Sequence, residues 1–475
     1  IAPGFGEDDA RVGRENGIPA VCPMDDEGRF TSEVPEYAGQ FVKDADKTII
    51  ERLKSERKLI KRDQYVHNYP HCWRCDSPLV YRAISSWFVN IDKIKDDMLA
   101  ANERINWTPA HLKHGRFGKW LEGARDWAIS RNRYWGAPIP VWTCEDPACG
   151  HDVCIGSVEE LETLSGHKVT DLHKHHVDKL TGACPKCGKT LRRTPEVLDC
   201  WFESGAMPYA QAHYPFENKE RFEATFPADF IAESLDQTRG WFYTLVVLSA
   251  ALFKDTSFKN VVVTGLVLAE DGKKMSKRLR NYPEVSEIFD SYGADALRVY
   301  LMNSALVKAE ELNFSGHGVK EVLRAFHLPL WNSYSFFVTY ANVDGWDPER
   351  DAEPLASITN PLDRWILSAT ERLVGEVNEQ MDRYDLQRSI TPLMGFLDEL
   401  TNWYIRRSRR RFWKGTLDTE KKGAYTTLYR VLTRLSQVIA PFTPFISEAI
   451  WRGLRSDAMP ESVHLSDYPQ AEASL

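Results

Sequence analysis

The strongest constraint on the fold is a long apolar segment that lies between two strand-like segments in the middle of the chain. Residues 229–232 are predicted to form a short strand, residues 238–253 a helix, and residues 261–265 a buried strand rich in valine. A strand, a crossover helix and a second strand in one sheet form a right-handed parallel unit. This part of the chain therefore predicts an α/β fold with parallel strands.

Beyond about residue 285, apolar residues recur at the three- and four-residue steps of amphipathic helices. Three such series cover residues 362–381, 393–404 and 428–439, and a further helical stretch at 446–454 follows two prolines. Helices in series with one apolar face each are typical of a bundle. The predicted fold class is therefore α/β plus all-α.

The first 80 residues are rich in turns and are predicted to be β-leaning, as the end of a β-rich domain. Gly4, Gly6, Gly17 and Gly28 separate short segments there. The opening residues, IAPG, are typical of the middle of a loop, so we expect a longer natural chain.

Length and charge set the broad class. A chain of 475 residues has room for roughly two to four domains. Its net charge of −8 argues against a surface that is basic throughout, although a local basic patch can still bind phosphate. No run of about 18 apolar residues or export signal is evident. We therefore expect a cytoplasmic protein with no membrane partner.

Four of the nine cysteines form two close pairs that suit a metal site. Cys144 and Cys149 precede one glycine, and Cys184 and Cys187 precede another, as in a turning zinc knuckle. Four thiolates can close a tetrahedral structural Zn²⁺ site. The alternatives are loop cysteines without metal, or a ligand set that includes Cys154 or His151.

Two other groups of metal-ligand residues are interpreted differently. Cys72 and Cys75 form a close pair without a second pair to complete a site, so we expect no complete metal site there. His173, His175 and His176 are interpreted as a solvated loop.

A basic loop follows the buried strand. Residues 271–278 read DGKKMSKR, in which Asp-Gly favours a turn and the cations leave the carboxyl end of a parallel strand, the usual ligand edge. Lys274 and Lys277 could therefore reach a polyphosphate. A basic loop taken alone is more often simply solvated.

This loop resembles the KMSKS signature of class I aminoacyl-tRNA synthetases, with Arg278 in place of the last serine. Other segments resemble the isoleucine-specific branch: residues 233–242 (ESLDQTRGWF, with Ser234 in place of glycine), 199–205 (DCWFESG), 129–140 and 402–407. The CWRC string at 72–75 and Arg278 are more similar to the eukaryotic-type branch.

The resemblance implies ATP-dependent activation of isoleucine, with Mg²⁺, and transfer of isoleucine to tRNA(Ile). Trp201 and Trp241 would wall the isoleucine side-chain pocket, and Gln237 would contact its carboxylate. Glu233 and Asp236 would bind ribose hydroxyls. Lys274 and Lys277 would hold the triphosphate, and the other implied ATP or adenylate contacts are Gly265, Met275 and Ser276.

Two further sites follow from the resemblance. Asp9 would bind the substrate ammonium group in an editing site that removes misactivated valine; the alternative is a helix N-cap at Asp8 or Asp9 for a segment that begins at Ala10. The basic stretch 406–414 would contact tRNA through Arg406, Arg407, Arg410 and Arg411. Its alternative is a solvated helix face paired with Asp398 and Glu399.

The expected domains are the end of an editing domain (1–80), a return into the catalytic domain (81–143), a zinc-binding insertion (144–195), the second half of a Rossmann catalytic domain (196–284), a stem-contact region (285–355) and an anticodon-binding bundle (356–475).

No counterpart of the family's HIGH motif occurs in the sequence. We therefore expect a monomer that is inactive in amino-acid activation by itself, with an exposed sheet edge at the strand 261–265. Rival interpretations are a valyl- or leucyl-type enzyme, another nucleotidyl transferase and a noncatalytic tRNA-binding module.

Overall fold

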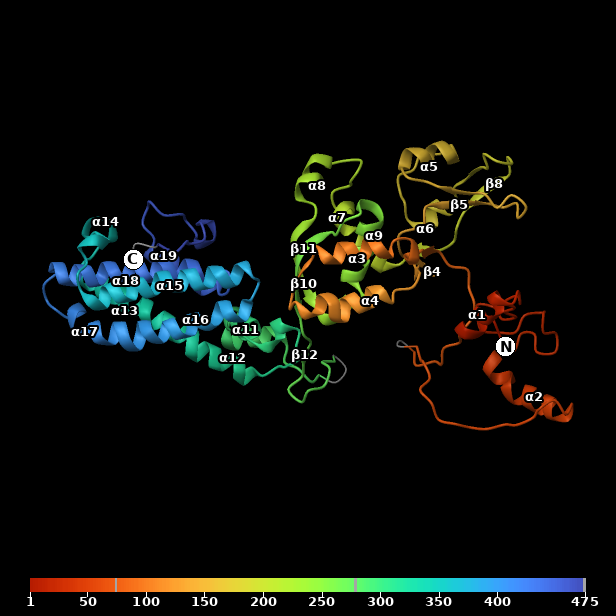
Figure 1. Cartoon of the computed structure of the whole chain (residues 1–475), viewed down its shortest axis with the longest axis horizontal. Coiled ribbons are helices and arrows are strands. Elements are labelled where there is room, and N and C mark those ends of the chain that lie inside the picture. Colours follow the sequence, from red (N-terminus) through yellow and green to blue (C-terminus); the bar gives the residue numbers. More distant parts are fainter. Residues whose placement is uncertain (73–74, 277–279, 473–475) are drawn as a thin grey trace. The chain divides into compact units, whose positions relative to one another are not determined.

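The computed structural model describes residues 1–72, 75–276 and 280–472. The chain divides into two compact units (Figure 1). Unit 1 comprises Ile1–Phe88 and Ala128–Arg131, and unit 2 comprises Val89–Trp127 and Asn132–Leu475. Among the helices of the described residues, none has the length and apolar character that crossing a membrane requires.

Unit 1 corrects the β-leaning prediction for the first 80 residues. Its regular elements there are two helices, α1 (Glu7–Glu15) and α2 (Val42–Ser55), and the β-structure found among its described residues before residue 80 is confined to isolated bridges. The helical period explains α2, because Ala45, Ile49 and Leu53 recur every four residues and are its more buried side chains.

The predicted α/β unit is confirmed in unit 2. A three-stranded parallel sheet has the order β10-β11-β2, with Ile231 opposite Val261 and Ser234 opposite Thr264. Its strands are β10 (Ala228–Ser234), β11 (Phe258–Thr264) and β2 (Asn106–Thr108). Helix α9 (Trp241–Phe253) connects β10 to β11 and packs against the sheet through Leu245 and Val246.

The strand predicted to be an exposed edge is instead the central one. β11 pairs with β10 on one side and with β2 on the other, through Asn260, Val261 and Val262. The sequence gives little sign of β2, because a strand of three residues carries almost no alternating pattern. Short neighbouring helices complete this region: α3 (Lys95–Glu103), α4 (Gly118–Glu122), α7 (Cys200–Ala210) and α8 (Lys219–Thr225).

The cysteine-bearing insertion forms its own antiparallel sheet, of order β6-β5-β8-β7. Its elements are β5 (Val141–Cys144), β6 (Asp152–Cys154), α5 (Val158–Ser165), α6 (Lys174–Val177), β7 (Thr181–Ala183) and β8 (Thr190–Arg193). Trp142, Leu161 and Leu191 are buried between the sheet and these helices. A small separate core therefore supports the insertion.

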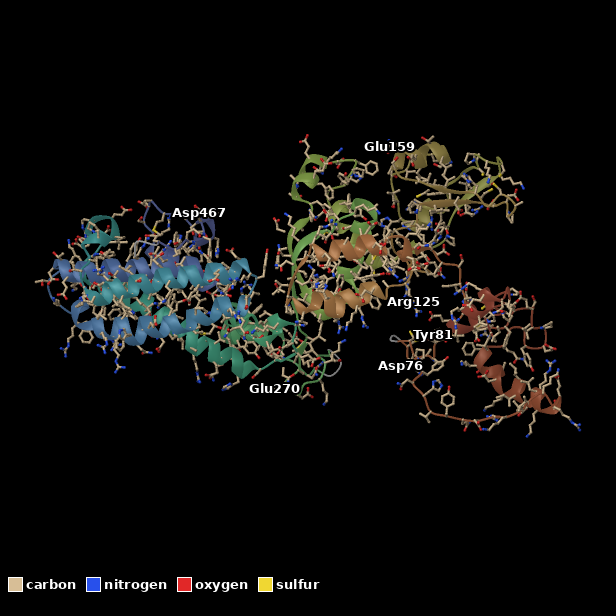
Figure 2. All side chains as sticks on the ribbon, viewed as in Figure 1. Asp76, Tyr81, Arg125, Glu159, Glu270 and Asp467 are labelled. Carbon is tan, nitrogen blue, oxygen red and sulfur yellow. The ribbon has the colours of Figure 1, made fainter. Side chains whose placement is uncertain are left out.

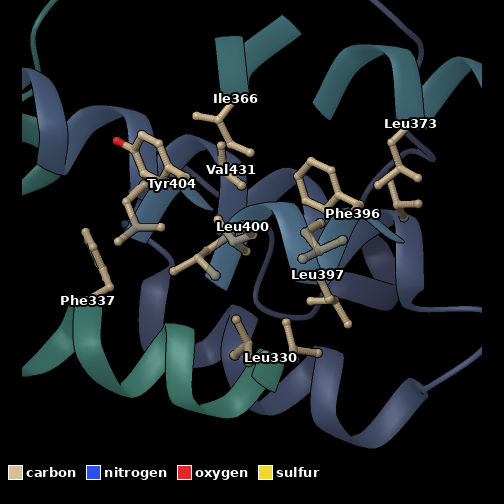
Figure 3. Close-up of a cluster of buried hydrophobic side chains, with 14 of the residues drawn as sticks. Leu330, Phe337, Ile366, Leu373, Phe396, Leu397, Leu400, Tyr404 and Val431 are labelled. Carbon is tan, nitrogen blue, oxygen red and sulfur yellow. The ribbon is translucent and has the colours of Figure 1, made fainter. Parts of the chain in front are cut away.

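The predicted helical bundle is also confirmed. Its helices are α15 (Pro361–Asp382), α16 (Leu386–Asp398), α17 (Arg406–Phe412), α18 (Thr419–Ile439) and α19 (Pro444–Leu454). Ile366, Leu400 and Val431 come from three parts of this region and meet in one apolar cluster (Figure 3). Asn360, Asp385 and Asp418 cap the first turns of α15, α16 and α18 with their side chains.

Further helices lie between the sheet and the bundle in the sequence. They are α10 (Val285–Tyr292), α11 (Ala294–Met302), α12 (Gly316–Val322), α13 (Leu328–Asp344) and α14 (Pro348–Asp351). Two-residue strands complete the regular elements: β1 (Phe88–Val89), β3 (Trp127–Ala128), β4 (Ser130–Arg131), β9 (Val197–Leu198), β12 (Val267–Leu268) and β13 (Leu312–Asn313). β12 and β13 are parallel neighbours, so the chain leaving β11 is held against the segment that follows α11.

Candidate functional site

The candidate active site lies at the carboxyl ends of β10 and β11. The parallel register places Glu233 opposite Val263 and Ser234 opposite Thr264, so the segments that follow both strands start at one edge of the sheet. This edge is where open α/β sheets bind their ligands. The predicted residues Glu233, Asp236, Gln237 and Gly265 all come from these two strand ends.

A network of hydrogen bonds fixes the turn after β10. The side-chain oxygen of Gln237 accepts a bond from the Trp241 backbone N–H (3.0 Å), and its amide nitrogen donates to Asp236 Oδ2 (3.1 Å). The Ser234 hydroxyl donates to the other carboxylate oxygen of Asp236. The polar groups predicted to bind the substrate are therefore oriented before any ligand arrives.

The two predicted pocket tryptophans adjoin this turn. Trp201 lies in the first turn of α7, where Asp199 accepts a bond from its backbone N–H (3.4 Å), and its ring remains 40% exposed. The Trp241 indole N–H donates to the Ser204 carbonyl of α7 (3.1 Å), which ties α9 to α7. An apolar ring with an open face and a second ring fixed close by suit a side-chain pocket.

Gly240 is a site residue that the sequence analysis did not single out. A Cβ atom at this position would lie 2.8 Å from Gln237 Oε1 and 3.2 Å from the Trp201 ring. Only glycine allows both side chains to approach here. The sequence signal that could have identified Gly240 is its position directly before an apolar helix.

The basic loop predicted at residues 271–278, which we call the lysine loop, begins with a tight turn next to Glu270, which is labelled in Figure 2. Gly272 has a φ of +76° and its N–H donates to the Ala269 carbonyl (2.9 Å), which confirms the predicted Asp-Gly turn. The Lys273 ammonium lies 2.9 Å from Asp271 and, together with the Lys273 backbone N–H, holds the pKa of that carboxyl below its usual range. Lys274 is exposed and has no ion pair with any described residue. Lys277 and Arg278 lie outside the described residues.

Two further residues shape this loop. Asn281, which the sequence analysis did not identify, accepts a bond from the Ser276 N–H (2.9 Å) and donates to the Lys274 carbonyl (3.1 Å). Its amide therefore clamps the two ends of the segment that contains Met275. Gly265 packs so closely that a Cβ would lie 1.7 Å from the Glu310 carbonyl oxygen, so packing alone already requires glycine there.

The four predicted metal ligands gather in the insertion. The sulfur atoms of Cys144, Cys149, Cys184 and Cys187 all lie within 4.8 Å of one another. Gly150 and Gly188 have positive φ values of +51° and +75°, as expected where each cysteine loop turns back. The geometry is compatible with a tetrahedral four-thiolate metal site.

The thiol environments of the four cysteines differ from one another. Burial, as the largest cause, raises the pKa of Cys149. At Cys184 burial also raises the pKa, but hydrogen bonds from the Lys186 and Cys187 backbone N–H groups outweigh it and bring the pKa to about 7. The alternative ligands are not in the cluster: Cys154 is exposed, and His151 contributes a backbone carbonyl that accepts from the Cys144 N–H (2.9 Å).

The predicted tRNA-binding arginines separate into two groups. Arg406, Arg407 and Arg410 are exposed and have no ion pair with any described residue, and the Arg407 guanidinium lies 3.7 Å from the centre of the Trp403 ring. The alternative of pairing with Asp398 and Glu399 is not found among the described residues, and the Asp398 carboxylate instead accepts a hydrogen bond from Asn402 (2.6 Å).

Arg411 is a correction to the predicted set. It is 8% exposed and binds Asp363 with both terminal nitrogens, at 2.7 and 2.6 Å. The Tyr404 hydroxyl donates to the same carboxylate (2.7 Å). Arg411 is therefore part of the bundle interior and is not available to phosphate.

Asp9 lies in the first turn of α1 in unit 1. The helix begins at Glu7 after Gly6, and no side chain caps it, so the alternative in which Asp8 or Asp9 is the N-cap is wrong. The three acidic residues of this turn, Glu7, Asp8 and Asp9, suit the positive end of the helix dipole.

Comparison with known proteins gives concordant matches. Residues 28–313 match the family model of class I tRNA synthetases (I, L, M and V), and residues 363–475 match the anticodon-binding domain of tRNA ligase. An isoleucine–tRNA ligase of Treponema denticola is 61% identical over 98% of this chain, and one of Protochlamydia amoebophila is 57% identical over 98%. The chain spans 43% and 44% of the length of these two relatives.

Solved structures agree on the fold. A Mycobacterium tuberculosis methionyl-tRNA synthetase in complex with methionyl-adenylate matches 82% of this chain with a TM-score of 0.58 at 16% identity, and the match covers 66% of that protein. An Agrobacterium radiobacter LeuRS–tRNA–LeuAMS ternary complex matches 74% of this chain with a TM-score of 0.55 at 21% identity, and the match covers 44% of that protein. At these identities the likeness shows a shared fold.

Proposed function

Because the chain belongs to the class I aminoacyl-tRNA synthetases of the isoleucine, leucine, methionine and valine group, we propose that it contributes to an isoleucine–tRNA ligase. The reaction would activate isoleucine with ATP and then transfer it to tRNA(Ile). The observation that carries the amino-acid assignment is 61% identity to an isoleucine–tRNA ligase across almost the whole chain. The position of Trp201 and Trp241 near the oriented Gln237 supports it.

The proposed chemistry requires positioning more than covalent catalysis. The isoleucine carboxylate attacks the α-phosphorus of ATP and pyrophosphate leaves; a ribose hydroxyl of the tRNA then attacks the adenylate carbonyl and AMP leaves. Lys274, which is exposed and has no ion pair within the described part of the chain, would neutralise the triphosphate together with Mg²⁺ and Lys277. Asn281 would position this loop by holding its backbone.

Substrate recognition is assigned to the turn after β10 and to the lysine loop. Gln237 would contact the isoleucine carboxylate, and Trp201 and Trp241 its side chain. Glu233 and Asp236 would bind the ribose, and the backbone around Gly265, Met275 and Ser276 would line the adenylate. The prior orientation of Asp236 and Gln237 lowers the ordering cost of binding.

Zn²⁺ is proposed as a structural ion in the insertion. Cys144, Cys149, Cys184 and Cys187 would hold it, since four thiolates within 4.8 Å match its preferred ligand set. The bound ion would cross-link the two cysteine loops.

The remaining partners follow from the same family. Arg406, Arg407 and Arg410 would contact tRNA phosphates, and Asp9 would hold the substrate ammonium group during editing of valine. Cys72, Cys75 and Arg278 support a eukaryotic-type branch, although Arg278 and the two residues between the cysteines lie outside the described part of the chain. A cytoplasmic monomer is proposed for the working enzyme.

The test is amino-acid-dependent ATP–pyrophosphate exchange, measured on the complete coding product and on the 475-residue chain side by side. Isoleucine should support exchange by the complete product far better than valine or leucine. The 475-residue chain should give none, because a one-sided nucleotide site leaves the triphosphate misaligned. Preference for valine or leucine would reject the amino-acid assignment, and full exchange by the chain alone would reject its expected inactivity.

A further inference from the structure

Five exposed aromatic and imidazole rings lie next to one another in the insertion and in the segment just before it, and we call this group the ring row. Trp135 neighbours His173, His173 neighbours His175, and the group branches at His175, which neighbours both His176 and Tyr134. Neighbouring ring centres lie 4.6 Å apart for Trp135 and His173, 6.1 Å for His173 and His175, 4.2 Å for His175 and His176, and 6.3 Å for His175 and Tyr134. The prediction of a solvated loop is wrong for His175 and His176, which lie in α6, although all three histidines are exposed.

The residues of the ring row are exposed to solvent. Tyr134 is 72% and Trp135 67% exposed, and the His173 and His176 side chains are about half exposed. Single exposed rings are ordinary, but a contiguous exposed group is typical of an interaction site. The planes of Tyr134 and His175 lie within 14° of each other, so their faces have nearly one orientation.

One carboxylate orders the histidines. Asp171 accepts a bond from the His173 backbone N–H (2.8 Å), and its two oxygens lie 2.6 Å from His173 Nδ1 and 3.4 Å from His176 Nε2. These contacts engage the carboxylate and fix two imidazoles. The ring row is therefore pre-organised, which lowers the cost of ordering it on binding.

The chemistry of the row selects its partner. Within the described residues, the four-cysteine cluster is the group that gathers at least three ligand atoms closely enough for a metal ion, and the three histidines are not gathered in this way. Unpaired RNA bases stack on tyrosine, tryptophan and histidine rings. Arg133 and Lys179 lie next to the two segments that build the row, and both are exposed without an ion pair to any described residue. They could meet the phosphates.

We infer that the ring row is a stacking surface for unpaired nucleotides of the tRNA substrate. The inference rests on the proposed function for the identity of the RNA, and on the ring geometry for the stacking. It adds to the enzyme a contact that recognises base faces without reading sequence.

The test measures binding of a labelled, unstructured oligoribonucleotide of about 12 nucleotides and of tRNA to the 475-residue chain by fluorescence anisotropy. Trp135→Leu and His175→Leu should each weaken binding roughly 5- to 150-fold, the usual effect of losing one stacked base. His175→Phe keeps a ring and should bind like the unsubstituted chain. Phe216→Leu removes another exposed ring of the same unit and is the matched control.

Salt titration separates stacking from charge. The ring variants should leave the salt dependence of binding unchanged, whereas Arg133→Gln should reduce its logarithmic slope by about 1. Circular dichroism and zinc content should match those of the unsubstituted chain, and Tyr134→Leu provides a second variant if Trp135→Leu misfolds.

Three results would overturn the inference: no oligoribonucleotide binding by the unsubstituted chain, equal affinity for Trp135→Leu and Phe216→Leu, or no difference between His175→Leu and His175→Phe. The proposed function fails separately. Isoleucine-dependent exchange by the complete product needs no tRNA, so a complete product without this exchange would reject the proposed ligase function. Intact exchange, together with unchanged RNA affinity in the ring variants, would reject only the stacking role of the ring row.

Discussion

Arg410 and Arg411 are neighbours in the sequence with opposite roles in the structure. Arg410 is exposed, whereas Arg411 is buried against Asp363 and beside Tyr404, whose pKa is raised by burial and by that carboxylate. The sequence could have predicted that Arg411 lies on the same helix face as Tyr404, because steps of four and three residues from Tyr404 reach Ser408 and then Arg411. The sequence could not have predicted that Asp363 is its partner, since that carboxylate lies on another helix.

We predict that Arg411→Met destabilises the bundle by about 3–5 kcal/mol, because it leaves the fully buried Asp363 without its countercharge. Urea unfolding followed by helical circular dichroism measures the effect. Arg410→Met is the matched control, and its stability should change by less than about 0.5 kcal/mol. Adding Asp363→Asn to Arg411→Met should recover part of the loss. Equal midpoints for the two arginine variants would show that the buried pair contributes nothing.

At the active site, Trp241→Ala in the complete coding product should weaken isoleucine activation by roughly 2–4 kcal/mol in kcat/KM, or about 30- to 1000-fold, because it removes a large packed ring. Lys274→Ala should instead slow adenylate formation with a smaller effect on isoleucine binding. Pre-steady-state exchange kinetics separate the two effects. Loss of tRNA affinity alone in both variants would contradict the division between pocket and phosphate loop.

At the scale of elements, long periodic segments were predictable and short ones were not. β10, β11, α15 and α19 lie within a few residues of their predicted bounds, whereas α18 begins at Thr419, well before the predicted start at Leu428. Helix α9 begins at Trp241 instead of Thr238, because the preceding residues form a 3₁₀ turn that ends at Gly240 in a non-helical conformation. Tertiary contacts decide such boundaries.

Gly265 offers a test of how closely β11 must approach its neighbour. Gly265→Ala places a methyl group 1.7 Å from the Glu310 carbonyl oxygen, where backbone must move. The substitution should lower thermal stability and separate the chain after β11 from the Leu306 carbonyl, which now accepts from the Gly265 N–H. Gly415→Ala, with open space around its Cβ, is the control. A melting temperature equal to that of Gly415→Ala would contradict this packing.

The insertion should depend on its metal. Cys184→Ser should abolish stoichiometric zinc and increase protease cleavage between residues 144 and 195, because one ligand of the tetrahedral set is lost. Cys154→Ser should retain zinc and resistance, since that thiol lies outside the cluster. Metal analysis and limited proteolysis provide the measurements. Full zinc occupancy in Cys184→Ser would point to a different ligand set.

For the whole molecule, the two units should differ in local stability. The bundle buries a large apolar cluster, whereas the buried apolar side chains among the described residues of unit 1 before residue 80 are Met24, Tyr37 and Ala45. Amide hydrogens of α2 should therefore exchange much faster than those of α15 and α18. Hydrogen-exchange mass spectrometry on the intact chain measures this, and equal protection in α2 and α18 would contradict it.

The site was predictable at the level of segments, because motif residues following two parallel strands had to meet at one sheet edge. Gly240 and Asn281 were missed for a physical reason. Gly240 matters because its missing side chain leaves space for Gln237 and Trp201. Asn281 matters because its side chain forms hydrogen bonds with the backbone of Ser276 and Lys274. Neither property is visible in a pattern of residue types.

The pairing of β5 with β8 has a consequence for how this architecture can vary. Trp142 lies opposite Arg193 and Thr143 opposite Arg192, so the chain enters and leaves the insertion through adjacent antiparallel strands. Segments with neighbouring ends can be lengthened, shortened or exchanged with little disturbance to the domain that carries them. The strands β5 and β8 thus form a natural grafting point, where a foreign zinc ribbon of matched ends could replace residues 145–189 while the sheet β10-β11-β2 keeps its register.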